Sequence, residues 1–76
     1  MDNYVVSKNM NLNGYHEVHR EDCPLLPEMS DRLYLGLYTN CRPAVEKAKN
    51  YYNLVTGCTR CSKPCALMRE DVIIRK

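Results

Sequence analysis

The chain has 76 residues with no Trp and no Phe, yet it contains five cysteines and two histidines. A domain of this length buries only about 60% of the surface that its unfolded chain exposes, so its hydrophobic core is marginal. Leu, Val and six Tyr must form most of that core, and each buried Tyr hydroxyl needs a hydrogen-bond partner. Domains this small usually depend on a disulfide, a metal ion or oligomerisation. The cysteines and histidines are the residues that could supply such a cross-link.

The N-terminal ten residues show no basic segment followed by an apolar run, so we expect no signal peptide. The longest apolar run is far too short to span a membrane. We therefore expect a cytoplasmic protein with no membrane partner. In a reducing compartment structural disulfides are rare, and clustered Cys and His are more typical of metal ligands.

Two segments near the N-terminus have the patterns of β-strands. Residues 4–9 are rich in β-branched side chains, and residues 14–20 alternate between two faces. An Asn-Gly pair, a common hairpin turn, lies between them. We predict a β-hairpin, followed by a loop or a single helical turn over residues 21–31, which contain two prolines.

A third strand and a helix are predicted next. In residues 32–39, every second residue is a leucine: Leu33, Leu35 and Leu37 alternate with two tyrosines and a glycine. This alternation predicts a strand with one strongly apolar face. The period then changes to that of a helix. Thr39 or Asn40 can cap this helix, and Pro43 is tolerated in its first turn. The residues that share the apolar face of the helix are Ala44, Val45, Ala48, Tyr51 and Tyr52.

These elements predict an α+β fold, a small zinc-stapled domain with a β-hairpin, a third strand, one main helix and a C-terminal cysteine knuckle. We expect one domain over residues 1–76, with an ordered core from about residue 4 to residue 69 and a tail at residues 70–76. A short helix over residues 64–71 and a strand-like tail are possible at the C-terminus.

The strongest motif is Cys58-x-x-Cys61, in which two intervening residues let both sulfurs approach one point. Zinc needs four nitrogen or sulfur ligands in a tetrahedral arrangement, so one pair is not enough. His19-x-x-x-Cys23 offers a second pair upstream. Together the two pairs would join the end of the hairpin to the C-terminal turn. Closing so long a loop removes much of the entropy of the unfolded chain.

Several alternatives remain open from the sequence. His16 or Cys65 could replace one of the four zinc ligands. Cys58 and Cys61 could instead form a dithiol redox pair, although the βαβ unit typical of thioredoxin-like motifs is not visible. Disulfides, or no joint role for these cysteines, are further options. Cys41 lies at the predicted helix start, where its thiol could become nucleophilic, but a small buried residue is the favoured interpretation.

No residue is predicted to be catalytic. The acidic residues show no paired spacing, and neither a Gly-rich phosphate loop nor a Ser nucleophile motif is present. Four protein ligands would leave no open position on the zinc. No small-molecule substrate is evident. Three basic residues lie around the C-terminal cysteines and could contact nucleic acid: Arg60, Lys63 and Arg69. The net charge of +2 is too small to indicate nucleic-acid binding by itself, so we favour the interpretation that these residues form a solvated surface.

Two segments, "YHEVHREDCPLLP" and "CRPAVEKAKNYYNLVTGCTRC", resemble the Ada-like family of zinc-binding domains, which comprises the N-terminal metal-binding module of the Ada DNA-repair protein and its small relatives. The similarity covers residues 15–61. It implies one zinc ion in a compact α+β module. In the Ada protein a zinc-bound cysteine accepts a methyl group from a DNA phosphotriester. His19 stands where that protein has a cysteine, and an imidazole cannot replace a thiolate as acceptor, although Cys23 remains a candidate.

We therefore expect a small domain with structural zinc that binds a macromolecule, either a protein or a nucleic acid such as DNA. A zinc-thiolate methyl acceptor, or another thiol-based enzyme, is the alternative.

Overall fold

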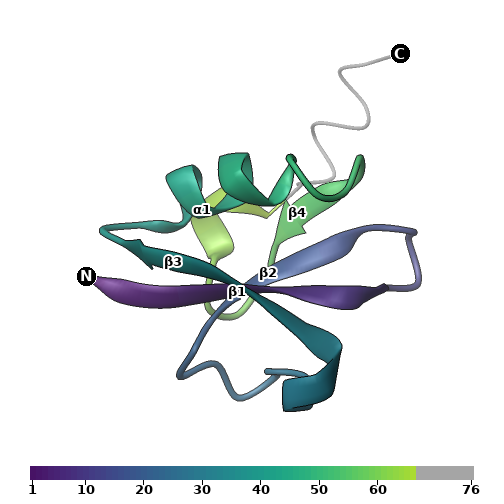
Figure 1. The fold of residues 1–76 in the computed structure, drawn as a ribbon, viewed down its shortest axis with the longest axis horizontal. Coiled ribbons are helices and arrows are strands. Elements are labelled where there is room, and N and C mark those ends of the chain that lie inside the picture. The colour runs from purple at the N-terminus through teal and green to yellow at the C-terminus, as the bar shows by residue number, and fades with distance from the viewer. Residues whose placement is uncertain (67–76) are drawn as a thin grey trace.

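The computed structural model describes residues 1–66. Its centre is a four-stranded mixed sheet with strand order β3-β1-β2-β4, and one helix covers one face of this sheet (Figure 1). This arrangement confirms the predicted α+β class. The predicted C-terminal strand and most of the predicted short helix lie outside the described residues. The elements are β1 (Asp2–Met10), β2 (His16–Arg20), the 3-10 turn η1 (Met29–Asp31), β3 (Arg32–Tyr38), α1 (Cys41–Ala48), β4 (Val55–Gly57) and the 3-10 turn η2 (Lys63–Cys65).

The predicted hairpin is formed by β1 and β2, which pair in antiparallel fashion with Val6 opposite Val18. Asn11 organises the turn between them, because its Oδ1 accepts the backbone N–H groups of Asn13 and Tyr15, each at 2.9 Å. Gly14 has a φ of 84°, a conformation that glycine adopts at little cost. Asn13 has no positive φ, so the Asn-Gly pair does not form the two-residue turn typical of such pairs, and the hairpin is closed by a longer turn that Asn11 organises.

The third strand is present, but its expected apolar face is only partly correct. Tyr4 pairs with Gly36 whereas Val5 pairs with Tyr34, so Leu35 is an extra residue that forms a β-bulge. After the bulge the alternation is inverted. Leu35 is buried, Leu37 is half-exposed, and Tyr38 packs against the core in its place. Gly36 permits this bulge with a φ of 136°.

The helix α1 begins as predicted and ends earlier than predicted. The side chain of Asn40 accepts the backbone N–H of Arg42 at 2.9 Å and caps the first turn. Ala44 and Ala48 are fully buried against the sheet, which allows the helix to approach it closely. The helix was expected to continue through Tyr52, but it ends at Ala48 and is followed by turns, which leave Tyr51 half-exposed.

The strand β4 is not among the elements predicted from the sequence. It pairs with β2 in parallel, with His16 opposite Val55 and Val18 opposite Gly57. The backbone N–H of Cys58 continues this ladder to the carbonyl of Val18 at 2.9 Å. The chain therefore enters its C-terminal cysteine turn directly beside β2.

The hydrophobic core lies between the sheet and α1. Its members come from every strand and from the helix. Among the described residues, no helix is long and apolar enough to cross a membrane. The buried core residues are Tyr4, Val6, Val18, Leu35, Cys41, Ala44, Ala48 and Val55.

The bulge generates a testable prediction at Gly36. A Cβ there would lie 3.1 Å from the hydroxyl oxygen of Tyr38, and the backbone would be strained in addition. We expect Gly36→Val to lower the free energy of unfolding by about 1–3 kcal/mol, measured by urea denaturation. Gly14→Asn is the control, because its site is open and Asn tolerates a positive φ. Equal effects of the two substitutions would contradict the role given to Gly36.

Candidate metal centre

The structure brings together the four residues singled out by the two sequence motifs. The ligand atoms of His19, Cys23, Cys58 and Cys61 all lie within 4.8 Å of one another. The Sγ atoms of Cys23 and Cys58 are 3.8 Å apart, and Cys61 Sγ lies 3.9 Å from Nδ1 of His19. Two sulfurs bound tetrahedrally at about 2.3 Å from zinc would be about 3.8 Å apart. This group, which we call the His/Cys group, could hold a metal ion.

The strand alternation of β2 places His19 in the group. Val18 points into the core below α1, so His19 faces the opposite side of the sheet, where it is only 3% exposed. A turn closed by the hydrogen bond from the N–H of Cys23 to the carbonyl of Arg20 then returns Cys23 to the same place. The first ligand pair therefore depends on the end of β2 and the turn after it.

The second ligand pair is positioned by β4 and by the turn that follows it. The hydrogen bond from Cys58 to Val18 anchors the first residue of this turn, and the N–H of Ser62 donates to the carbonyl of Cys58 at 2.9 Å. Gly57 is required just before it, because a Cβ there would lie 2.6 Å from the carbonyl oxygen of Ser62. The close approach of β4 to the turn fixes Cys58 and Cys61 beside β2.

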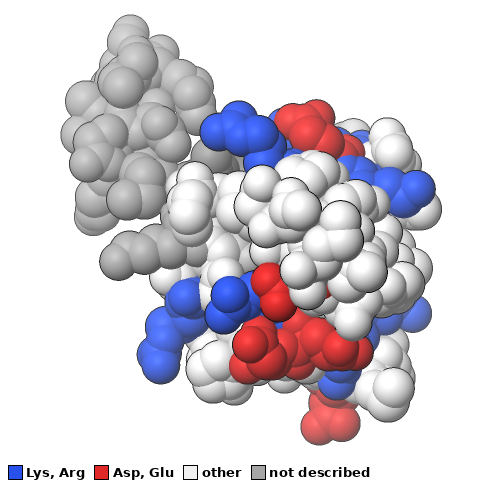
Figure 2. Space-filling view, turned by 90° about the vertical axis from the view of Figure 1, so that its left-hand side faces the viewer, with Lys and Arg blue, Asp and Glu red and all other residues white. Residues whose placement is uncertain are grey.

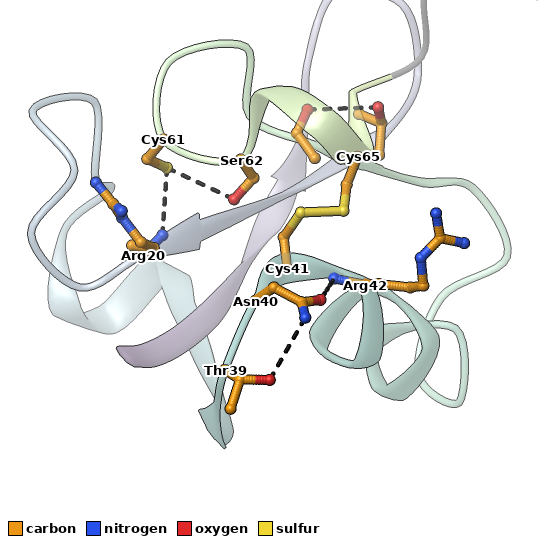
Figure 3. Close-up of a disulfide and its surroundings, with 10 residues drawn as sticks. Arg20, Thr39, Asn40, Cys41, Arg42, Cys61, Ser62 and Cys65 are labelled. Atoms are coloured by element: carbon orange, nitrogen blue, oxygen red, sulfur yellow. Dashed lines mark hydrogen bonds between the residues drawn. A yellow bond between two sulfur atoms is a disulfide. The ribbon is translucent and has the colours of Figure 1, made fainter. Parts of the chain in front are cut away.

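Each sulfur of the group accepts a backbone N–H. Arg20 donates to Cys61 at 3.2 Å (Figure 3), Leu25 donates to Cys23 at 3.4 Å, and Arg60 donates to Cys58 at 3.4 Å. The hydroxyl of Ser62 also lies 3.8 Å from the sulfur of Cys61. Hydrogen bonds of this kind favour the thiolate, which is the form that binds metal.

Burial opposes charge on two of the four residues, Cys61 and His19. Desolvation, together with the hydrogen bond to Cys23, raises the pKa of Cys61 to about 12. Burial lowers the pKa of His19, and the nearby carboxylate of Glu17 opposes this effect. A neutral imidazole is the form that binds metal, whereas the thiol protons must leave when a metal enters. A bound cation would supply the charge that buried thiolates lack on their own.

Cys65 was considered as an alternative ligand, but the structure places it elsewhere. It forms a disulfide with Cys41, at the start of α1 (Figure 3). The 3-10 turn η2, closed by a hydrogen bond from the N–H of Cys65 to the carbonyl of Ser62, directs this side chain toward the helix. Cys41 was expected to be a small buried residue. It is buried in the core, but its sulfur is bonded and is not a free nucleophile.

His16, the other alternative ligand, also lies outside the His/Cys group. It is on the helix-facing side of β2, where its ring stacks on Tyr52 with centroids 3.8 Å apart. Its Nδ1 lies 2.9 Å from the carbonyl oxygen of Ser7. His16 and His19 differ by three positions, so the strand places them on opposite faces of the sheet.

The structure gives limited support to the basic residues named from the sequence. Arg60 is exposed in the turn between Cys58 and Cys61, Lys63 is the first residue of η2, and Arg69 lies outside the described residues. On the face shown in Figure 2, one group of acidic side chains lies below the centre and others lie at the upper and lower edges, with basic side chains in separate groups among them. Asp2, Glu21 and Asp22 line one hollow together.

Comparisons with protein-family models, with curated proteins and with solved structures found no match to this chain. The similarity to the Ada-like family therefore stays a prediction from the sequence. What the structure contributes is the geometry of a buried His/Cys group.

Removal of the disulfide tests whether it is independent of the metal centre. It joins residues 24 positions apart. The entropy of a closed loop of that size corresponds to about 3 kcal/mol. We expect the double substitution Cys41→Ala with Cys65→Ala to lower the free energy of unfolding by about this amount, measured by urea denaturation. Metal stoichiometry should stay unchanged; a variant that stays folded but loses the metal would contradict the separation of the disulfide from the His/Cys group.

Proposed function

We propose that this chain is a zinc-binding module in which the metal is structural. One observation carries the proposal: three thiols and an imidazole, from two segments far apart in the chain, meet within 4.8 Å. Three sulfurs and one nitrogen are a typical ligand set for zinc, and softer thiolate ligands disfavour magnesium and calcium. The group is largely buried, as a structural site requires.

A structural role is supported by the number and the position of the ligands. Four protein ligands complete a tetrahedral shell and leave no position for water or substrate. A metal ion there would bridge the end of β2, with the turn after it, to the turn after β4. The surrounding core is small, so such a cross-link would contribute much of the stability of the domain.

The surface supports a role in binding a protein. Tyr34 and Leu37 lie on the face of the sheet opposite α1, and each is more than half exposed. Leu25 and Met29, on the segment that leads into β3, are also exposed. Exposed apolar side chains mark contact sites for other proteins where they form one contiguous patch, and these four residues are the candidates for such a patch. A nucleic-acid partner is less well supported, because acidic and basic groups are mixed on the face shown in Figure 2.

The cytoplasmic location expected from the sequence stays a prediction. The Cys41–Cys65 disulfide weighs against a strongly reducing compartment, where such bonds are rarely maintained. Thiol trapping of the protein in its native cells would show whether this bond is present there.

The first prediction from this proposal concerns metal content. Native mass spectrometry of the chain purified with zinc should show one ion per molecule. Cys58→Ala should bind no zinc and should melt at a much lower temperature, because the apparent free energy of a structural zinc site, about 10 kcal/mol or more, is comparable to the whole stability of a small domain.

His16→Ala is the matched control for this experiment. It removes an imidazole from the same strand but from the opposite face, so the zinc stoichiometry should be retained even if the loss of stacking on Tyr52 lowers stability. A wild-type chain that is folded and free of metal in the presence of zinc would contradict the proposal.

A second candidate function is transfer of a methyl group from a DNA methyl phosphotriester to a cysteine. Cys61 is the member of the group whose side chain is partly exposed. In such a reaction a sulfur–methyl bond forms, the methyl–oxygen bond breaks and a phosphodiester leaves. His19 at the first ligand position weighs against this function. Incubation with methyl phosphotriester DNA should leave the mass of the protein unchanged; a gain of one methyl group on Cys61 or Cys23 would favour the repair reaction over a purely structural zinc.

A further inference from the structure

The carboxylate of Glu17 lies beside His19 but does not belong to the His/Cys group. Glu17 precedes His19 by two residues on β2, so both side chains lie on the same face of the sheet. One carboxylate oxygen, Oε1, is 3.6 Å from Nε2 of His19. This ring nitrogen is the one that does not face the sulfur of Cys61, because Nδ1 lies 3.9 Å from that sulfur. Glu17 is therefore placed on the side of the imidazole away from the sulfur of Cys61.

The second oxygen of this carboxylate is held by the hairpin turn. Asn11 donates from Nδ2 to Oε2 of Glu17 at 3.0 Å. The same amide group accepts two backbone N–H groups of the turn through its Oδ1, and its backbone N–H donates to the carbonyl of Tyr15 at 2.7 Å. The carbonyl of Asn11 also accepts the backbone N–H of Gly14 at 3.0 Å, so four other hydrogen bonds fix Asn11 and hold the partner of Glu17 in place.

The position of Glu17 also limits its contact with water. Its side chain is 30% exposed, and the side chain of His19 beside it is 4% exposed. Leu25 and Pro27 line the same hollow as Glu17, His19 and Asn11 and supply an apolar wall. A carboxylate in such surroundings acts more strongly on a neighbouring imidazole than it would in bulk water.

We propose that Glu17 is a positioning residue for the metal centre, and that Asn11 holds its carboxylate in place. The carboxylate favours the form of the ring that carries its proton on Nε2, which leaves the lone pair of Nδ1 directed toward the thiols. Metal-bound histidines commonly have such a carboxylate partner, which orients the ring and increases its basicity as a ligand. A chain of contacts then runs from the hairpin turn through Asn11, Glu17 and His19 to the three cysteines.

This inference rests on the proposed function, and the test is a competition between the protein and a zinc chelator. Glu17→Ala should raise the apparent dissociation constant for zinc by about 10-fold to 100-fold. Glu17→Gln loses the charge and keeps only one acceptor oxygen, which can face either Asn11 or His19 but not both, so its constant should lie between those of the wild type and of Glu17→Ala. Asn11→Asp keeps the turn acceptor but removes the donor, and should weaken zinc binding in the same direction.

Glu46→Ala is the matched control. Glu46 is also an acidic residue, but it lies on α1, away from the His/Cys group, and its carboxylate pairs with Lys49 at 3.5 Å. The affinity of this variant for zinc should be unchanged.

A second measurement separates positioning from a general effect on stability. In the zinc-loaded protein, the proton on Nε2 of His19 should exchange with water faster in Glu17→Ala than in the wild type, as followed by nitrogen-15 NMR. Zinc binding by the wild type with no change of affinity in Glu17→Ala would overturn this inference and leave the proposed function intact. A folded wild-type chain that binds no zinc would overturn both.

Discussion

The short parallel ladder between β2 and β4 is the contact on which the rest of the structure depends. It brings the two halves of the His/Cys group together, because His19 lies in β2 and Cys58 follows β4 directly. With three paired positions, this ladder is shorter than most strands and needs support. That support comes from both sides of the sheet. The disulfide ties η2 to α1 on the helix side, and the His/Cys group lies on the face to which His19 points.

The hydrophobic core is too small to stabilise the fold by itself, so these contacts are needed in addition. Alanines at the helix–sheet contact let α1 lie close to the strands, but they bury little apolar surface. The chain has no large aromatic core residue other than Tyr, so packing alone contributes less than in most domains of this length. A disulfide acts mainly on the unfolded chain, whereas a metal bound by the folded chain alone stabilises the native state directly. The disulfide and a metal ion held by the His/Cys group would therefore stabilise the domain by different physical routes.

The sequence predicted the parts of the fold that depend on local patterns. The Asn-Gly pair and the alternation around it predicted the hairpin, and two candidate caps, Thr39 and Asn40, predicted the start of α1, which Asn40 caps in the structure. The spacing of His19, Cys23, Cys58 and Cys61 also predicted which side chains meet, since ligand pairs have recognisable spacings. The bulge at Leu35 was not predictable from alternation, because one extra residue inverts every later side chain. β4 is too short for any periodic pattern. The Cys41–Cys65 bond depends on the direction in which η2 points the side chain of Cys65. The spacing of the cysteines along the chain does not predict that direction.

The disulfide between the first residue of α1 and the last residue of η2 makes residues 41–65 a covalent ring. This ring contains Cys58 and Cys61, together with the exposed connection between α1 and β4 in which Tyr51 and Leu54 are half-exposed. A protease that cuts this connection once would open the ring but release no fragment. The nicked chain would still carry all four members of the His/Cys group on one covalently joined molecule. A single cut in this accessible connection would therefore not separate the two ligand pairs.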